Sequence, residues 1–361
     1  MWGRVFRPAL VGSKDPTPRQ ACNQLRERNR IPVITRLKAV TLLGAFIWLA
    51  PAASASAQSL SYNSGQSVAP AYEGWEEDAD GAKYFLFGYM NRNWEEEPDI
   101  PVGPGNNFSP GTPDAGQPTH FLPRRNRFVF RVKVPAAWSE KEEMTWTLTS
   151  PNGKTEKAFA SLRLDYKVDD VVKASETGAL GAGSSSPEIR ANKPPVVKVD
   201  GAKAVATKVG QPVTLTALVT DDGVPKTRGA GLAGSAVANR GVRSDSAITN
   251  SEAAPRANRA MQPPARATVG KNVGLHLSWF VYRAPSDAPV SFEPVQIKPW
   301  EDTRAGANSP WAPVWVAPPM PADGKVSAKV TFSQPGTYVI RGIADDGALT
   351  GNDEVTVTVM K

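Results

Sequence analysis

The chain has 361 residues, a formal net charge of +7, one cysteine and two histidines. Nine of the 42 basic residues and two of the 35 acidic residues fall within residues 1–57, so the remaining 33 basic and 33 acidic residues cancel. A protein that follows a nucleic-acid backbone needs a surplus of Lys and Arg on its folded part. This balance therefore excludes nucleic acid as a partner, and the length suffices for two ordinary domains.

Residues 1–57 are expected to be a leader that ends in a secretory signal peptide. Arg36 and Lys38 precede an apolar stretch, 39–49, and Ala55-Ser56-Ala57 supplies the small residues of a cleavage site. A spanning helix needs about 20 apolar residues, and this stretch is shorter. We therefore expect export to the periplasm or the exterior, with cleavage after Ala57 and no membrane span afterwards.

Residues 58–170 predict a first β-sandwich. Met144–Ser150 alternates apolar and polar residues, and Asn152-Gly153 is a strong hairpin signal before Lys154–Leu164. Lys83–Met90 is apolar on both faces, which is typical of a central strand that is covered on both sides. No window of helical length shows an apolar stripe, so the domain is expected to be all-β.

A long loop, residues 91–127, interrupts this domain. It has seven prolines and four glycines, and loops of this length tend to be functional or disordered. The favoured interpretation is a stiff loop that folds back on the sheet through aromatic anchors and ion pairs, and the alternative is a binding platform. The candidate ligand-binding residues at its ends are Trp94, Glu95, Glu96, Glu97, His120, Arg124 and Arg125.

Residues 171–192 are small, polar and rich in Gly and Ser, so they are expected to be a flexible linker.

Residues 193–361 predict a second β-sandwich. Within it, residues 226–272 have no aromatic residue and an excess of Arg and Lys. Such a segment buries too little apolar surface to be ordered, and we expect protease to cut it first. The clearest strands are Val213–Thr220, Leu275–Tyr282, Lys325–Phe332, Tyr338–Ala344 and Glu354–Met360.

The second half resembles bacterial immunoglobulin-like domains of the PKD and cadherin-like kind. The resemblance rests on Asn192-Lys-Pro-Pro-Val-Val, Val209-Gly-Gln-Pro-Val-Thr-Leu and the closing strand pair from Gln334 to Val359. It implies that Trp279 is a core tryptophan and that Tyr338 is the corner tyrosine. The first half, with GYMNRNWEEE at 88–97 and HFLPRRNRFVFRVKVP at 120–135, resembles uncharacterised exported bacterial proteins. These resemblances imply a fold and no activity.

Two Asp-Asp-Gly turns end predicted strands of the second half, at residues 221–223 and 345–347. In an immunoglobulin-like sandwich, the loops after the second and sixth strands lie side by side. The favoured interpretation is that each aspartate caps its own turn through backbone N–H groups. The alternative is a Ca²⁺ site made by Asp221, Asp222, Asp345 and Asp346.

No catalytic site is predicted. Cys22 lies in the leader, no GxSxG motif occurs, and close His/Cys/carboxylate spacing for zinc is lacking. His276 alternates with its apolar neighbours and is expected to be structural or exposed. Adjacent acids such as Glu95–Glu97 usually form a solvated edge and not a glycosidase pair. We therefore expect neither a catalytic residue nor a bound cofactor.

Five tryptophans lie outside the clear strands, and flat aromatic faces can stack on sugars. The favoured interpretation is that they fasten loops to the sandwiches. We therefore expect an exported, non-catalytic binding or structural protein whose partner is a protein or glycan of the cell envelope. The alternative is a carbohydrate-binding accessory module, and the third candidate is a hydrolase. The tryptophans are Trp75, Trp94, Trp300, Trp311 and Trp315.

Overall fold

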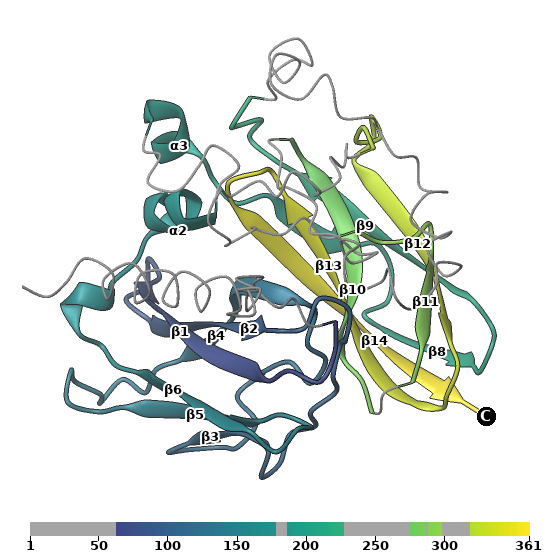
Figure 1. Ribbon diagram of the computed structural model, residues 1–361. Coiled ribbons are helices and arrows are strands. Elements are labelled where there is room, and N and C mark those ends of the chain that lie inside the picture. The colour runs from purple at the N-terminus through teal and green to yellow at the C-terminus, as the bar shows by residue number, and fades with distance from the viewer. Residues whose placement is uncertain (1–62, 178–185, 227–273, 286–287, 298–317) are drawn as a thin grey trace, which may run out of the picture. The chain divides into compact units, whose positions relative to one another are not determined.

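The computed structural model describes residues 63–177, 186–226, 274–285, 288–297 and 318–361. The predicted signal peptide lies outside these ranges, as do nearly all of the predicted insertion and the middle of the predicted linker. The described residues belong to a single compact unit. Their regular secondary structure is almost entirely β-strand, which confirms the all-β prediction (Figure 1).

The first sandwich has two three-stranded sheets, with strand orders β1-β2-β4 and β3-β5-β6. The central strand β2 is buried on both faces over Phe85–Tyr89, as its two-sided apolar sequence predicts. β5 and β6 form the predicted hairpin around Gly153, whose φ of 83° suits glycine. The strands are β1 (Val68–Glu77), β2 (Lys83–Asn91), β3 (Asn106–Ser109), β4 (Arg124–Lys133), β5 (Met144–Thr149) and β6 (Thr155–Ala160).

Aromatic rings fill the core between these two sheets. Phe87 stacks on Phe130 at 5.5 Å between ring centroids, and Trp146 meets both rings edge to face. Phe108 and Phe121, both from the 91–127 loop, also contact the Trp146 ring. The loop is therefore anchored by aromatic residues in the core, as the favoured interpretation predicts.

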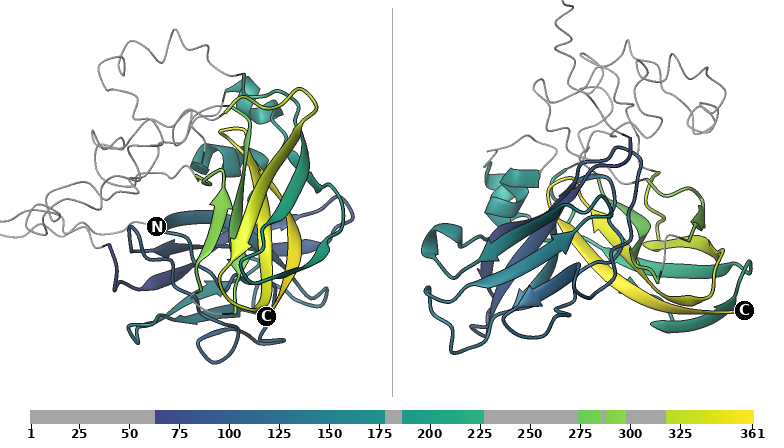
Figure 2. Two further views of the ribbon diagram at one scale, coloured as in Figure 1. Left: turned by 90° about the vertical axis from the view of Figure 1, so that its right-hand side faces the viewer. Right: turned by 60° about the horizontal axis from the view of Figure 1, so that its bottom comes forward.

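The second sandwich has two four-stranded sheets, with orders β11-β12-β9-β7 and β10-β13-β14-β8. This is the strand arrangement of an immunoglobulin-like fold, with a split first strand: β7 pairs with β9, and β8 pairs with β14 in parallel. The long β13–β14 hairpin is yellow in Figures 1 and 2. The strands are β7 (Val196–Val199), β8 (Ala204–Lys208), β9 (Val213–Thr220), β10 (His276–Arg283), β11 (Val290–Glu293), β12 (Lys325–Phe332), β13 (Gly336–Asp345) and β14 (Thr350–Met360).

Two residues singled out by the resemblance lie where it places them. Trp279 is fully buried in the core between the sheets. Tyr338 is also fully buried, and its hydroxyl donates a hydrogen bond to the carbonyl oxygen of Gln334, four residues upstream, at 3.1 Å. This back-bond is the geometry of a tyrosine corner, so the immunoglobulin-like prediction is confirmed at the level of the fold.

Short helices occupy the ends of the segment predicted to be a linker. They are α2 (Asp170–Thr177) and α3 (Pro187–Ala191), and the 3₁₀ turn η1 (Leu164–Tyr166) precedes this segment. The Ser186 side chain caps α3 by accepting from Ile189 N, and Pro187 sits at the first helical position. Ala174 of α2 and Ile189 of α3 form a small core with Ala348 and Leu349 of the β13–β14 loop. The helices are therefore docked on the second sandwich by apolar contacts.

Candidate functional site

Buried amide side chains hold the 91–127 loop from within. Asn106 donates to the carbonyl oxygens of Ile100 and Pro118, both at 2.9 Å, and accepts from the Trp146 indole N–H. Asn91 donates to the carbonyl oxygen of Phe121 at 2.9 Å. Buried carbonyl oxygens need hydrogen-bond donors. Here the side-chain amides supply the donors that a neighbouring strand would supply in a sheet. The loop is thus a fixed part of the first sandwich.

The start of the loop is closed by Trp94. Its ring is 4% exposed, and the Arg124 guanidinium carbon lies 4.1 Å above the ring centroid. The Glu96 carboxylate accepts from the backbone N–H of Gly65. Burial and cation–π stacking use the Trp94 ring inside the fold, and its assignment as a ligand-binding residue stays a prediction.

His120 lies between two carboxylates of the same loop. Its Nδ1 is 2.8 Å from Asp99 Oδ1, and its Nε2 is 3.0 Å from Glu97 Oε2. Burial alone lowers the pKa of His120, but the hydrogen bonds to Asp99 and Glu97 outweigh burial and raise the pKa to about 9. The ring is therefore an imidazolium at neutral pH and donates from both nitrogens, so it is not available as a general base.

The end of the loop pairs with the edge strand β10 of the second sandwich. The backbone N–H groups of Thr119 and His120 donate to the carbonyl oxygen of Tyr282, at 3.1 and 3.3 Å. The Thr119 hydroxyl accepts from Ala284 N at 3.0 Å and lies 3.2 Å from Ala284 O. The loop thus satisfies an edge that would otherwise expose backbone donors and acceptors.

An ion pair extends this joint. Both terminal nitrogens of Arg283 contact the Asp114 carboxylate, at 3.0 and 2.7 Å, and Arg283 Nε donates to the carbonyl oxygen of Gln117 at 2.9 Å. The hydrogen bonds from Arg283 lower the pKa of Asp114. The two parallel hydrogen bonds fix the relative orientation of the Arg283 and Asp114 side chains in addition to pairing their charges.

A second arginine crosses from β13 to the first sandwich. Arg341 is 7% exposed, stacks on the Tyr282 ring at 3.4 Å from the centroid, and donates to the carbonyl oxygen of Val129 at 2.5 Å. Its Nε donates to Glu354 at 2.9 Å. This one side chain therefore ties together three strands, β10, β13 and β14, and the backbone of β4.

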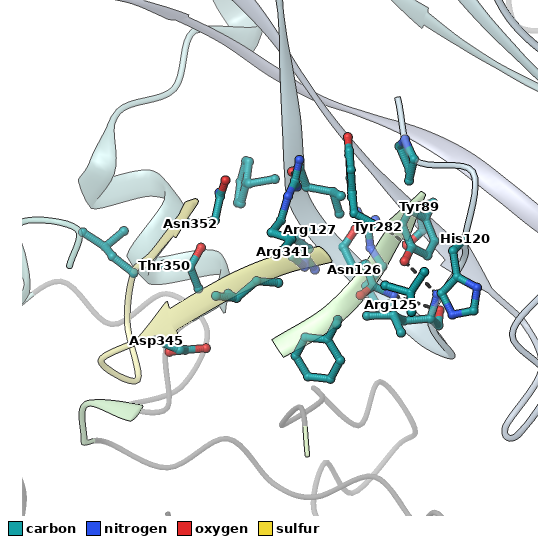
Figure 3. Close-up of a pocket in the computed structure, with 18 of the residues that line it drawn as sticks. Tyr89, His120, Arg125, Asn126, Arg127, Tyr282, Arg341, Asp345, Thr350 and Asn352 are labelled. Carbon is teal, nitrogen blue, oxygen red and sulfur yellow. Dashed lines mark hydrogen bonds between the residues drawn. The ribbon is translucent and has the colours of Figure 1, made fainter. Parts of the chain in front are cut away.

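A cavity of about 120 Å³ lies beside Arg341 (Figure 3). This is well below the ~300–1,000 Å³ of ordinary small-molecule sites. Its basic wall residues already contact carboxylates: Arg125 contacts Glu73 at 2.7 Å, and Arg127 contacts Glu176. The cavity therefore resembles a gap in a polar joint more than a preformed ligand pocket.

The β4 backbone at this cavity is unusual. Arg124 and Phe128 have φ of 61° and 50°, values that non-glycine residues rarely adopt. The β2–β4 register shifts at Gly88, opposite Phe128, and an added Cβ at Gly88 would lie 2.3 Å from both Asn126 O and Glu73 Oε1. Backbone strain of this kind persists only where surrounding contacts hold the residues in place. Here the contacts around the cavity hold them.

Four of the seven candidate residues fall into two groups, while Glu96 accepts from Gly65 N, Glu97 contacts His120 and the backbone N–H of Glu95 donates to Asn63 O. His120 and Arg125 line the cavity (Figure 3), while Trp94 and Arg124 pack on each other. Sequence reasoning missed Asp114 and Arg283, which make the ion pair of the joint, and also Glu73 and Arg341, which pair with Arg125 and Glu354 beside the cavity. One signal was present: Arg341 lies on a strand of otherwise apolar character, YVIRGIA, where a buried arginine requires partners.

The Asp-Asp-Gly turns are capped as the favoured interpretation predicts. Asp221 accepts from Gly223 N and Asp345 accepts from Gly347 N, at 2.9 and 2.7 Å. Asp222 accepts from Lys193 N, while the adjacent Asn192 donates to Asp346, so one short segment contacts both turns. Within the described ranges, no three His, Cys, Asp or Glu side chains are grouped so as to hold a metal ion. The calcium site stays a prediction.

Comparisons with known proteins add little to this description. No protein-family model and no curated protein matches the chain. Among solved structures, a chimeric titin Z1Z2 is 9% identical, covers 82% of this chain and 100% of its own, and has a TM-score of 0.20. The Yersinia pseudotuberculosis adhesin InvE is 10% identical, with coverages of 81% and 58% and a TM-score of 0.20.

Domains 4 and 5 of the S-layer protein SbsC are 10% identical, cover 82% of this chain and 98% of their own, and have a TM-score of 0.18. Similarities at this level carry no argument about function, so the immunoglobulin-like assignment rests on strand order and on the tyrosine corner. No helix in the described ranges has the length and hydrophobicity needed to cross a bilayer.

Proposed function

We propose that this chain is an exported, non-catalytic binding or structural protein of the cell envelope or exterior. The observation that supports the proposal most directly is the use of the 91–127 loop. The loop carries the residues best suited to chemistry, and the structure engages them in structural contacts. His120 is held by Asp99 within the loop, while Asp114 bonds to Arg283 and Thr119 bonds to Ala284 of the second sandwich. Rigid coupling of its two domains suits a protein that resists mechanical force or presents a binding surface.

Partner capture from the envelope tests this proposal. The mature chain, carrying a photo-crosslinker on an exposed position such as Phe159, 54% exposed, is incubated with the envelope fraction of the source cells. A specific protein or glycan adduct, competed by unlabelled protein, is the expected result. Recovery of the mature chain only in the cytoplasmic fraction of its source cells would overturn the proposal.

The glycan-binding alternative depends on tryptophans outside the described residues. Trp75 and Trp94, the two described candidates, are 3% and 4% exposed, whereas Trp300, Trp311 and Trp315 lie outside the described ranges. Glycan-array binding that is lost in Trp311→Ala and kept in Trp94→Ala would favour this alternative. The hydrolase candidate requires turnover that is lost when Glu95–Glu97 are changed to Gln.

We also retain the calcium proposal for the two Asp-Asp-Gly turns. A cation bound only by the folded state raises the melting temperature. The proposal therefore expects the melting temperature of the mature protein to rise with millimolar Ca²⁺ and to fall with chelator. The calcium proposal is wrong if the melting temperature is the same in both buffers and Asp222→Asn behaves like wild type. The two turns would then be structural caps alone.

A further inference from the structure

A β-bulge in β4 turns consecutive side chains into the cavity beside Arg341. Residues 127–129 of β4 lie opposite the single residue Gly88 of β2, and all three line the cavity. Successive side chains of a regular strand point to opposite faces, so this arrangement depends on the bulge. Bulges re-aim side chains and often lie beside functional sites. Phe128 is held in this bulge at a φ of 50°, and strained backbone of this kind points to a binding role for the aromatic side chain that it places on the wall.

Side chains of the second sandwich form another wall. Phe280, Tyr282 and Ile343 line the cavity from β10 and β13. Phe128, Val129 and Ile343 are only partly buried, so apolar surface on both walls stays open to solvent. Covering such surface with an apolar group of a partner is favourable.

The cations of the wall are already paired with carboxylates outside the wall. A charged ligand would have to displace these carboxylates, and the wall carboxylate Asp345 would repel an anion further. An uncharged ring needs no such exchange, because a guanidinium can stack on it while its N–H groups stay bonded in the guanidinium plane. Arg341 already does this: it stacks on the Tyr282 ring at 3.4 Å while its Nε donates to Glu354 at 2.9 Å. The pairs are His120 with Asp99, Arg125 with Glu73, Arg127 with Glu176, Lys173 with Glu76 and Arg341 with Glu354.

The cavity has room for one ring. Its volume is about 120 Å³, and an apolar cavity of ~150 Å³ holds benzene. Ligands that are bound whole occupy ~300–1,000 Å³, so most of a larger occupant would lie outside. Thr350 and Asn352, both exposed, line the cavity at the end away from His120 (Figure 3). They give the rest of such an occupant a polar surface to contact.

We propose that the cavity is an anchor site for one aromatic side chain, Phe or Tyr, of a protein partner. Aromatic side chains that fill a pocket carry much of the affinity of protein interfaces. This inference rests on the proposed function, since it names the chemistry by which a non-catalytic binding protein recognises its partner.

NMR titration of the mature chain with p-cresol, the ring and hydroxyl of a tyrosine side chain, tests the site itself. We expect saturable shifts of the Val129 and Ile343 methyl signals, and none with benzoate, which has a ring of the same size and a negative charge. The absence of a saturable shift with p-cresol overturns the proposal. Benzoate binding as tight as that of p-cresol also overturns it, because the site would then select an anion.

A cavity-filling variant locates the binding. Ile343→Phe places a ring of the chain itself in the cavity and is expected to weaken p-cresol binding about 10-fold or more. Val339→Phe is the matched control, because Val339 is also partly buried, lies on the same face of β13 and does not line the cavity. We expect this control to bind p-cresol like wild type. Equal binding by Ile343→Phe and wild type would place p-cresol elsewhere and overturn the proposal.

A random peptide library displayed on phage distinguishes a protein partner from a free aromatic molecule. Selection on wild type, with counter-selection on Ile343→Phe, is expected to enrich peptides that share a Phe or Tyr. Changing that residue to Ala should lower the affinity about 10-fold or more, and p-cresol should compete with the peptides. Enriched peptides without a shared aromatic residue overturn the proposal, and p-cresol binding without any enriched peptide overturns the assignment to a protein partner.

Failure of this inference can be told from failure of the proposed function. Crosslinking at Phe159 tests for a partner without using the cavity, so a specific adduct there with no p-cresol binding would remove the anchor site alone. Recovery of the mature chain only in the cytoplasmic fraction would overturn the proposed function and leave p-cresol binding unchanged.

Discussion

His120 carries its proton because two carboxylates hold the ring from both sides. Its pKa, raised to about 9, is above its unfolded value of ~6.5. The folded state therefore binds the proton more tightly than the unfolded chain. The stabilisation is complete below pH ~6.5 and is lost as the pH rises toward 9.

We expect the free energy of unfolding of the mature chain to fall by up to about 3 kcal/mol between pH 6.5 and pH 9. His120→Gln, which keeps hydrogen bonding and loses the charge, should remove this decrease in denaturant titrations. His276→Gln is the control and should retain it. A decrease of equal size in the His120→Gln protein would show that some other group is responsible.

At Gly351, any side chain would clash with the backbone of a neighbouring segment. A Cβ added there would lie 1.7 Å from the carbonyl oxygen of Pro195. Because the obstacle is main chain and not a flexible side chain, Gly351→Ala is expected to cost about 3 kcal/mol of stability. Gly105→Ala is the control, because its nearest neighbour is at 3.7 Å. Equal melting temperatures for the two variants would contradict the close approach.

The strands that sequence alone predicts are those with clear alternation or an apolar run on both faces. β2, β5, β9 and β13 meet these conditions, and the structure has them within a few residues of the expected ranges. β3 was not predicted, because it is four residues long and lies in a Pro-rich loop where no period is visible. It exists because its pairing with β5 and the bonds of Asn106 hold it.

The helix α3 was also missed, although a signal for it was present. Ser186-Pro187-Glu188 is a helix start, with a capping serine, a proline at the first helical position and an acid in the first turn. The Gly/Ser-rich residues before it dominate the composition of the segment, and that composition favours a flexible linker. A five-residue helix is stable only because Ile189 is buried against the β13–β14 loop.

Only some residues of the candidate site could be predicted from the sequence. His120 and Arg125 stand out by residue type, and they do line the cavity. Their surroundings come from β10 and β13, more than 150 residues further along the chain, and no local pattern encodes that proximity. The ion pairs at Arg283 and Arg341 therefore required the structure.

The joint between the loop and β10 can be weakened at Thr119 with almost no change in shape. Thr119→Val removes the hydroxyl that meets both backbone groups of Ala284, at 3.0 and 3.2 Å. Leaving these buried groups without a partner is expected to cost about 2–3 kcal/mol. Thr147→Val, on the partly exposed face of β5, is the control and should change stability by less than about 0.5 kcal/mol. Equal unfolding midpoints for the two variants would show that the joint contributes nothing.

The two sandwiches have separate cores, but polar bonds connect them at several points. Asp114, Thr119 and Val129 of the first bond to Arg283, Ala284 and Arg341 of the second. The Thr119–Ala284 bond is buried and the Arg341–Val129 bond is partly buried, so opening the joint exposes these polar groups together. The two cores should therefore unfold in one cooperative step.

Calorimetry of the mature chain is expected to show a single transition whose van't Hoff and calorimetric enthalpies agree. Arg341→Met, which keeps the aliphatic volume and loses every polar bond of the guanidinium, should split it into two overlapping transitions. Two resolved transitions in wild type would instead show that each sandwich is stable independently of the joint.

The parallel pairing of β8 with β14 determines how the second sandwich responds to mechanical load. β7 is antiparallel to β9 and is peeled away one bond at a time when tension acts at Asn192. β8 then bears the tension: five residue pairs, from Ala204–Thr356 to Lys208–Met360, run in the same direction. Pulling the start of β8 against the end of β14 shears all these bonds at once. A chain tensioned between these two points therefore meets its greatest resistance at this short edge strand.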